Sequence, residues 1–447
     1  MAKVEGFDFF PLHFDGDGAL EAHAELDALT GHIAAAGSTD LITIAHGFRN
    51  SESEATGLYT EFLKNFRAHV TRPELASLAP RTFVVAGVFW PSKAFAEGPQ
   101  DKEGGTASLA DAASERQGVE DQLRHLLDDH ATAAQKAAVK KALGLLDDVE
   151  TKTSAQDEFV KTLLSLVEPE APNDDEGLSV IRSQAGSEVL AKLETPILLP
   201  TVPNDGQGGV TAVGGGGGAS DGGGVLGIGG FFSSVFGRVG QFVNATTWYM
   251  MKSRSGTVGV NGLAPAIRAV KAKAPGLRVH VVGHSLGGRL SAACAKALTT
   301  APKLQPDSLS LLEAAFSHYG FSANNGHGKP GFFREVIAEK IVKGPLISTF
   351  SMQDTVVGTA YAVASRLADD NTEAIGDEND QYGGIGRNGT QKTTEQARQT
   401  LHLPGAAYAF TTGVVHNLDG SGGLVKDHGD VRNPVVTYAV ASAIAHT

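Results

Sequence analysis

The chain has 447 residues and a formal net charge of −13, from 37 basic and 50 acidic side chains. This balance argues against nucleic acid or an anionic membrane as the main electrostatic partner, because both repel an acidic protein. The single cysteine, Cys294, excludes a framework of intrachain disulfides, and its place in a helical pattern favours a buried packing role.

The N-terminal sequence from Met1 to Asp8 lacks the basic region, the apolar segment and the small-residue cleavage site of a secretory signal. The longest apolar stretch without charges, residues 225–237, is too short to span a bilayer and is rich in glycine. By default we therefore expect a cytoplasmic protein without a transmembrane helix, and we leave export without a cleaved signal open.

Apolar runs that are typical of buried strands alternate with helical patterns in the first part of the chain. Strands are predicted at 7–14, 41–45 and 82–90, and amphipathic helices at 20–33 and 55–70. Strands that alternate with helices form parallel sheets covered on both faces. The order therefore predicts an α/β fold with a mostly parallel central sheet and helices on both faces.

The alternation stops between residues 92 and 244, where we predict an insertion in the main fold. Its first part is helical and charged, and one short strand follows at 197–200. Glycine dominates residues 201–230, and such a stretch cannot bury enough apolar surface to order itself strongly, so we expect it to be mobile. The predicted domains are residues 1–91 and 245–447, which form the sheet, and residues 92–244, which form a cap.

Apolar residues recur at helical spacing at the end of this insertion, from Phe232 to Val243. One interpretation is a helix docked on the sheet. The other is an apolar flap, tethered by the glycines, that covers an entrance or contacts lipid. The second interpretation predicts a transient contact with a lipid surface through residues 225–243.

The alternation of strands and helices returns after the insertion. The predicted elements are helix 266–273, strand 279–282, strand 309–316, strand 345–351, helix 357–367, strand 407–415 and a terminal helix that begins at Pro434.

A Gly-x-Ser-x-Gly pattern at residues 283–287 follows the strand predicted at 279–282, and apolar residues at helical spacing follow it at 290–297. In this setting the serine lies on a strained turn, with its hydroxyl exposed at the end of a sheet. We therefore predict that Ser285 is a nucleophile, against the alternative of a serine that only packs in a tight turn. A second match at 218–222 lies in a glycine run without a flanking strand or helix, so we attribute it to composition.

A serine nucleophile needs a base within hydrogen-bond reach and an acid that orients the base. In an open α/β sheet these groups meet at the carboxyl ends of the strands, so candidates lie just past strand ends. We select Asp354 as the acid because it follows the strand at 345–351, although it could instead cap the next helix. We select His428 as the base because it lies on the loop before the terminal helix.

Three other residues are alternatives in less favourable positions. Glu313 is predicted to lie within a strand, and Asp307 precedes that strand, at the wrong end of the sheet. His416 follows the last predicted strand directly, and we interpret it as a turn residue.

Two backbone N–H groups are predicted to stabilise the oxyanion of a tetrahedral intermediate. The N–H of Leu286 begins the helix after Ser285. The N–H of Phe48 is the second predicted donor, because it lies on the loop after the strand at 41–45 and Gly47 permits an unusual bend there.

The residues around these donors are candidate substrate-binding positions. Trp90, at the carboxyl end of another predicted strand, is expected to line an acyl pocket, with a core role as the alternative. His284 is adjacent to the nucleophile, and we expect a structural role for it. The candidate set is His46, Gly47, Trp90 and His284.

With Ser285, Asp354 and His428 in this order and His46-Gly47 after an early strand, the chain resembles the lipase- and esterase-like branch of the α/β-hydrolase superfamily. The sequence Gly-His-Ser-Leu-Gly-Gly around Ser285 is common among lipases. The resemblance covers both predicted sheet-forming segments and implies acyl transfer through a serine ester, with neither a metal nor an organic cofactor. The long glycine-rich insertion departs from the family, so substrate choice cannot be transferred from a relative.

Three functions are compatible with these residues. The first is a serine hydrolase of carboxylic esters, with a small-molecule or lipid-like substrate suggested by residues 225–243 and Trp90. The second is a peptidase, amidase or thioesterase that uses the same residues. The third is a binding module that keeps the fold without turnover, and an intact set of three residues argues against it.

Overall fold

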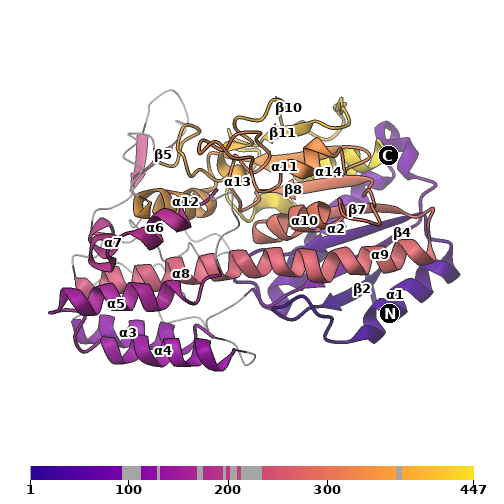
Figure 1. Cartoon of the computed structure of the whole chain (residues 1–447). Coiled ribbons are helices and arrows are strands. Elements are labelled where there is room, and N and C mark those ends of the chain that lie inside the picture. Colours follow the sequence, from indigo (N-terminus) through magenta and orange to yellow (C-terminus); the bar gives the residue numbers. More distant parts are fainter. Residues whose placement is uncertain are drawn as a thin grey trace. The chain divides into compact units, whose positions relative to one another are not determined.

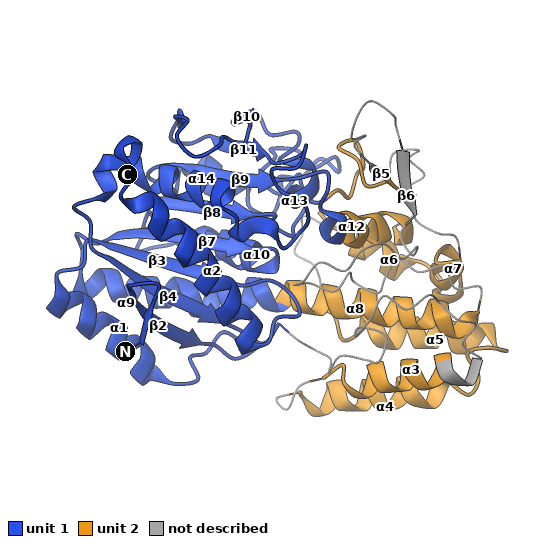
Figure 2. Cartoon of the chain, turned by 180° about the vertical axis from the view of Figure 1, so that it is seen from behind, with its two compact units in different colours: residues 1–92, 254–357, 384–447 blue, residues 93–253, 358–383 orange. Residues whose placement is uncertain are grey.

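The chain divides into two compact units (Figure 2). Unit 1 comprises residues 1–92, 254–357 and 384–447, and unit 2 comprises residues 93–253 and 358–383. The computed structural model describes residues 2–92, 112–127, 131–168, 175–194, 198–201, 209–212, 234–368 and 375–447.

Unit 1 contains a sheet of nine described strands in the spatial order β1-β2-β4-β3-β7-β8-β9-β11-β10 (Figure 1). Strand β1 pairs antiparallel with β2, and the other neighbouring pairs are parallel. The prediction of an α/β fold with a mostly parallel sheet is therefore confirmed. The strands are β1 Ala2–Val4, β2 Phe7–His13, β3 Asp40–Ala45, β4 Phe83–Phe89, β7 Arg278–His284, β8 Ser308–Leu312, β9 Leu346–Phe350, β10 Gln396–Thr400 and β11 Val415–Asp419.

The described helices of unit 1 lie between these strands in the sequence, except for η4 and α14, which follow the last strand, β11. They are α1 His23–Ala36, α2 Glu52–Val70, α9 Ala264–Lys273, α10 Leu286–Ala297, α11 Arg334–Ala338, α13 Ile385–Asn388 and α14 Pro434–Ala445, with the shorter turns η1 Pro73–Leu78, η3 Gly259–Leu263 and η4 Asp430–Arg432. Helix α14 illustrates how the sequence sets a helix start. The Asn433 side chain accepts hydrogen bonds from the first free N–H groups, and Pro434 occupies the first position, where no N–H is needed.

Alternate residues of strand β3 pack against different helices. Ile42 and Ile44 belong to the large core that also contains residues of α2 and α14. Leu41 and Thr43 face residues of α1 and α9 instead. Because successive side chains of a strand point to opposite faces, helices cover both faces of the sheet, as predicted.

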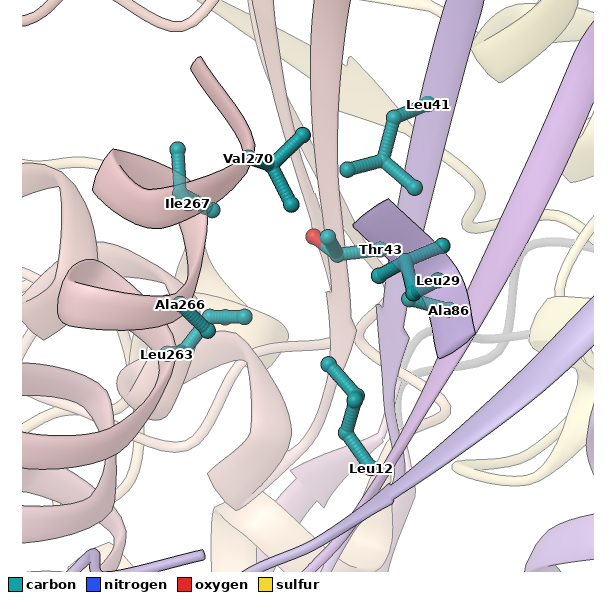
Figure 3. Close-up of a pocket in the computed structure, with 9 residues that line it drawn as sticks. All are labelled: Leu12, Leu29, Leu41, Thr43, Ala86, Leu263, Ala266, Ile267 and Val270. Carbon is teal, nitrogen blue, oxygen red and sulfur yellow. The ribbon is translucent and has the colours of Figure 1, made fainter. Parts of the chain in front are cut away.

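A gap between the sheet and the helices α1 and α9 is lined by side chains of which Thr43 alone is polar (Figure 3). It is too narrow to hold a water molecule. We therefore interpret it as a packing gap in the core and not as a binding site.

Unit 2 is helical, with one hairpin formed by β5 and β6. The strand predicted at 197–200 corresponds to β5. The described elements that lie wholly in unit 2 are α3 Ala112–Arg124, α4 Ala133–Leu145, α5 Thr153–Leu164, α6 Leu178–Ser183, α7 Gly186–Lys192, β5 Leu198–Thr201 and β6 Gly209–Ala212. Among the described helices, none combines the length and the apolar character needed to cross a membrane.

Two helices continue from one unit into the other. Helix α8 (Val235–Val258) begins in unit 2 and ends in unit 1, and α12 (Thr355–Leu367) begins in unit 1 and ends in unit 2. The insertion was expected to end at residue 244, but this position falls inside the continuous helix α8. The boundary between the units lies instead after residue 253, and residues 358–383 also belong to unit 2.

The predicted flap is described only in part. Residues 225–233 and most of the glycine-rich stretch at 201–230 lie outside the described residues. From residue 235 the segment is helix α8, and Val239, Phe242 and Val243 are buried. These apolar side chains are covered by protein in this structure.

Two predictions of strands near the candidate site need correction. The strand predicted at 309–316 ends at Leu312, because Glu313 has a φ of +44°, which no regular strand accommodates. The strand predicted at 407–415 is wrong, since β11 begins only at Val415. The apolar residues before it are explained by stacking, because the Tyr408 and Phe410 rings lie nearly parallel at 5.2 Å.

Strand β10 was not predicted. Its residues Gln396–Thr400 alternate between exposed and half-buried positions at the edge of the sheet, so they form no apolar run. His416 was expected to follow the last strand, but it lies within β11.

Candidate active site

Ser285 lies on a strained turn between β7 and α10. Its backbone has φ 57° and ψ −126°, a combination that residues other than glycine rarely adopt. Its N–H donates to the carbonyl oxygen of Leu312 at 3.0 Å, and its carbonyl accepts from the N–H of Ala315 at 3.0 Å. The end of β8 therefore holds the serine on its turn at the carboxyl end of β7.

Glycines allow close approach of three backbone segments at this turn. A Cβ at Gly283 would lie 2.1 Å from the carbonyl oxygen of Gly287, and a Cβ at Gly287 would lie 2.3 Å from that of Ala45. Gly47 lies against the serine itself, since a Cβ there would lie 2.6 Å from the Ser285 Cβ and 3.1 Å from its Oγ. The loop after β3 and the serine turn are therefore in contact.

Asp354 and His428 form a hydrogen-bonded pair at the same edge of the sheet. The Nδ1 of His428 lies 2.8 Å from Oδ2 of Asp354, and because a carboxylate only accepts, the proton is on Nδ1. The other oxygen, Oδ1, accepts from the N–H of Val357 at 2.9 Å. Asp354 thus performs both roles that its sequence position allowed, as partner of His428 and as cap of α12.

His284 supports the backbone that carries His428. Its Nε2–H donates to the carbonyl oxygen of His428 at 2.8 Å, and the two ring centroids are 4.6 Å apart. Burial, with a smaller influence of His428, holds the pKa of His284 well below its ordinary value, so the ring is neutral. These contacts agree with the structural role expected for His284.

His284 links the serine turn to the loop that carries His428. Ser285 follows His284 in the chain, and the ring of His284 packs on that of His428. No hydrogen bond joins Ser285 Oγ to His428 Nε2 among the described residues. Such contacts are often long before a substrate binds.

The loop after β3 is held by His46 and Trp90. The indole N–H of Trp90 donates to the carbonyl oxygen of His46 at 3.0 Å, and the two rings stack at 5.7 Å. In the His46 ring, Nδ1–H donates to the carbonyl oxygen of Gly47 at 3.0 Å and Nε2 accepts from the N–H of Trp90 at 3.4 Å. Both nitrogens are therefore committed in the neutral form, and burial lowers the pKa of His46 to about 4.

Trp90 was expected to line an acyl pocket, but its side chain is only 4% exposed. Its contacts support the alternative, a core role that fixes the loop before Phe48.

The N–H of Leu286 begins helix α10, where no intrahelical partner exists. The two predicted oxyanion donors, Leu286 and Phe48, thus directly follow Ser285 and Gly47, the two residues that touch each other.

Two buried charged residues near Asp354 were not selected as site residues from the sequence. Glu313 was set aside as a strand residue, but β8 ends at Leu312 and the Glu313 carboxyl lies beside that of Asp354. The sequence feature that could have indicated its role is an acidic residue inside an apolar run. Arg387 is 1% exposed and donates to the backbone carbonyls of Met352 and Asp354, and its position near the site had no signal in the sequence.

A second Asp–His–Ser set lies near the opposite ends of the strands. The Nε2 of His280 lies 2.9 Å from Oδ1 of Asp40, and its Nδ1 lies 2.9 Å from Oγ of Ser308. Asp40 begins β3 and Ser308 begins β8, so these residues mark the amino ends of parallel strands. All three are at most 1% exposed, and Arg81 forms an ion pair with Asp40 at 3.2 Å.

Comparisons with protein-family models, with curated proteins and with solved structures gave no significant match.

Proposed function

We propose that this protein is a serine hydrolase that cleaves carboxylic esters on an α/β-hydrolase fold. The observation that carries the proposal is the position of Ser285, on a strained strand-to-helix turn beside the hydrogen-bonded pair of His428 and Asp354. The order serine, aspartate, histidine along the chain, with each residue after a strand of a mostly parallel sheet, is that of α/β-hydrolases.

In the first half of the proposed reaction, Ser285 Oγ attacks the carbonyl carbon of the ester while His428 Nε2 takes its proton. Asp354 accepts the Nδ1–H hydrogen bond and stabilises the imidazolium. The N–H groups of Leu286 and Phe48 donate to the oxyanion of the tetrahedral intermediate. The bond to the alcohol then breaks as His428 donates its proton to the leaving oxygen, and the acyl group remains on Ser285.

In the second half, water attacks the acyl-enzyme while His428 accepts the water's proton. The carboxylic acid leaves and Ser285 recovers its proton. The same steps cleave amides and thioesters, so the substrate class must be established by rates on matched substrates. The proposed preference for lipid-like esters, and the proposed contact with a lipid surface, depend on the apolar residues 225–243.

Hydrolysis of p-nitrophenyl esters from acetate to palmitate, with and without detergent, tests the proposal. We expect a burst of p-nitrophenol followed by steady turnover, and slower release from matched p-nitroanilides. A folded protein that releases p-nitrophenol from none of the esters would contradict the proposal. Faster turnover of long chains at an interface supports the lipid-like substrate, and rates that do not depend on chain length exclude it.

A further inference from the structure

Glu313 occupies an unusual position at the end of β8. Its side chain is fully buried, and its φ of +44° is rare for a residue other than glycine. Its N–H donates to both the carbonyl oxygen and the hydroxyl of Thr349, at 3.2 Å each. Glu313 thus lies at the turn between Leu312 and Ala315, and both of these residues form backbone hydrogen bonds with Ser285.

The carboxyl group of Glu313 has an uncommon environment. Neither of its oxygens receives a well-formed hydrogen bond from a donor group among the described residues. The Asp354 carboxyl is the charged group that acts most strongly on it. The hydroxyl of Thr349 lies beside it, and Asp419 adds a further negative charge nearby.

The charges around this pair decide which carboxyl is ionised. Asp354 accepts from the N–H of Val357 and from Nδ1–H of His428, whereas no donor among the described residues bonds to the Glu313 oxygens, so a negative charge is better stabilised on Asp354. Arg387 is the buried cation beside the pair, and it donates to the backbone carbonyl of Asp354 at 3.2 Å. With Asp419 nearby as well, ionisation of both Glu313 and Asp354 would leave buried negative charge that the single cation Arg387 does not compensate.

The two largest influences on the pKa of Glu313 both raise it. Burial is the larger cause and the Asp354 carboxylate the next, and together they raise the pKa of Glu313 well above its ordinary value. The Thr349 hydroxyl opposes them with a smaller effect. Burial and the Asp354 carboxylate therefore both favour the protonated, neutral form of Glu313.

We propose that Glu313 is a neutral carboxylic acid whose O–H donates to the Asp354 carboxylate, and that it acts as a positioning residue for the pair of Asp354 and His428. The shared proton leaves a single negative charge opposite the imidazole and fixes the plane of the Asp354 carboxylate. The consequence for turnover depends on the proposed hydrolase function, but the presence of the proton does not.

Infrared difference spectroscopy of the full-length protein tests the proton directly. We expect the carbonyl stretch of a protonated carboxylic acid to persist at neutral pH, to shift in heavy water and to be lost in Glu313→Gln. In Asp354→Asn the neighbouring charge is gone, so the band should disappear at a lower pH than in the wild type. Absence of the band at neutral pH, or its retention in Glu313→Gln, would overturn the proposal.

Kinetics separate positioning from a general structural role. Glu313→Gln keeps a donor to Asp354, so we expect kcat within about twofold of wild type and an unchanged pH profile of kcat/KM. Glu313→Leu lacks the donor, so kcat should fall about tenfold while KM stays constant. An equal loss in both variants, or a shifted pH profile in Glu313→Gln, would contradict the positioning role. If Glu313→Leu does not fold, the spectra of Glu313→Gln and Asp354→Asn still decide.

The two proposals fail in distinguishable ways. A protonated-acid band in a protein that hydrolyses none of the esters would refute the hydrolase and leave the shared proton in place. Ester hydrolysis without the band would refute the shared proton and leave the hydrolase in place.

Discussion

Two Asp–His–Ser sets occupy opposite ends of the same sheet. The set of Asp40, His280 and Ser308 has both hydrogen bonds formed, at 2.9 Å each. In the set of Asp354, His428 and Ser285, only the bond between aspartate and histidine is formed, at 2.8 Å. Judged by hydrogen bonds alone, the first set would be the better candidate for a catalytic triad.

The surroundings of the two serines reverse this order. Ser308 lies in a regular strand, and its whole set is sealed from solvent. Ser285 lies on a strained turn at a helix start, beside a loop glycine, and the His428 side chain is 11% exposed. A strained turn at a helix start and backbone donors for an oxyanion therefore distinguish the proposed nucleophile from a serine that only closes a hydrogen-bond network.

Replacing the two serines should give the largest difference in kcat between the two Asp–His–Ser sets. Ser285→Ala should reduce kcat for ester hydrolysis on the order of 10⁵- to 10⁶-fold, because the nucleophile is lost. Ser308→Ala should leave kcat within about twofold, since this hydroxyl meets no substrate. Steady-state kinetics on one p-nitrophenyl ester measure both. Similar losses in the two variants would remove the distinction.

Replacing the two aspartates separates activity from stability. Asp354→Asn should lower kcat on the order of 10⁴-fold, because the imidazole loses the acceptor that sets its tautomer. Asp40→Asn should lower the free energy of unfolding by about 3–5 kcal/mol, because Arg81 and His280 lose a buried partner. Denaturant unfolding and kinetics of both variants give the comparison. A large loss of activity in folded Asp40→Asn would contradict it.

The contact between Gly47 and Ser285 gives a third test. Gly47→Ala should lower kcat/KM on the order of 10²- to 10³-fold, because its Cβ displaces the serine turn and the Phe48 donor. Gly57→Ala is the matched control, since a Cβ there meets nothing within 4 Å and alanine favours helix α2. Equal kcat/KM in Gly47→Ala and wild type would show that this loop does not support turnover.

The neutral His46 ring predicts a dependence of stability on pH. Its pKa is about 4 in the folded protein, against 6.5 ordinarily, so on acidification the unfolded chain binds the proton first. The stabilisation is complete above about pH 6.5 and decreases as the pH falls towards 4, by about 3 kcal/mol in total. Urea unfolding of His46→Asn should show a shallower pH dependence than wild type.

A control separates this effect from general acid sensitivity. His280 and His284 are shifted in the same direction, so the wild-type slope includes them, and the difference to His46→Asn isolates one residue. His23→Asn replaces an exposed histidine of α1 and should keep the wild-type slope. Identical slopes in His46→Asn and wild type would refute the buried neutral ring.

The sequence predicted features that depend on where elements end. Ser285 and Asp354 were placed correctly at strand ends because glycines and apolar runs mark these ends, and parallel strands bring their carboxyl ends to one edge. The partner role of His428 followed from the same reasoning, although the strand before it was misplaced. Tyr408 and Phe410 produced an apolar run that stacking, not strand pairing, explains.

Features that depend on register between distant strands could not be predicted. The bonds of His280 require Asp40 on β3 and Ser308 on β8 to lie beside it, and no local pattern encodes that alignment. Glu313 was considered as the acid and rejected because it was assigned to a strand; its positive φ ends the strand one residue before it, while the residues around it remain apolar. The exposed edge strand β10 had no apolar signal at all.

Labelling with a fluorophosphonate, followed by mass spectrometry of the peptides, tests the central claim most directly. We expect one covalent adduct, on Ser285, that is lost in Ser285→Ala, slowed in His428→Ala and unchanged in Ser308→Ala. Folded protein that remains unlabelled, or an adduct on a serine other than Ser285, would contradict it.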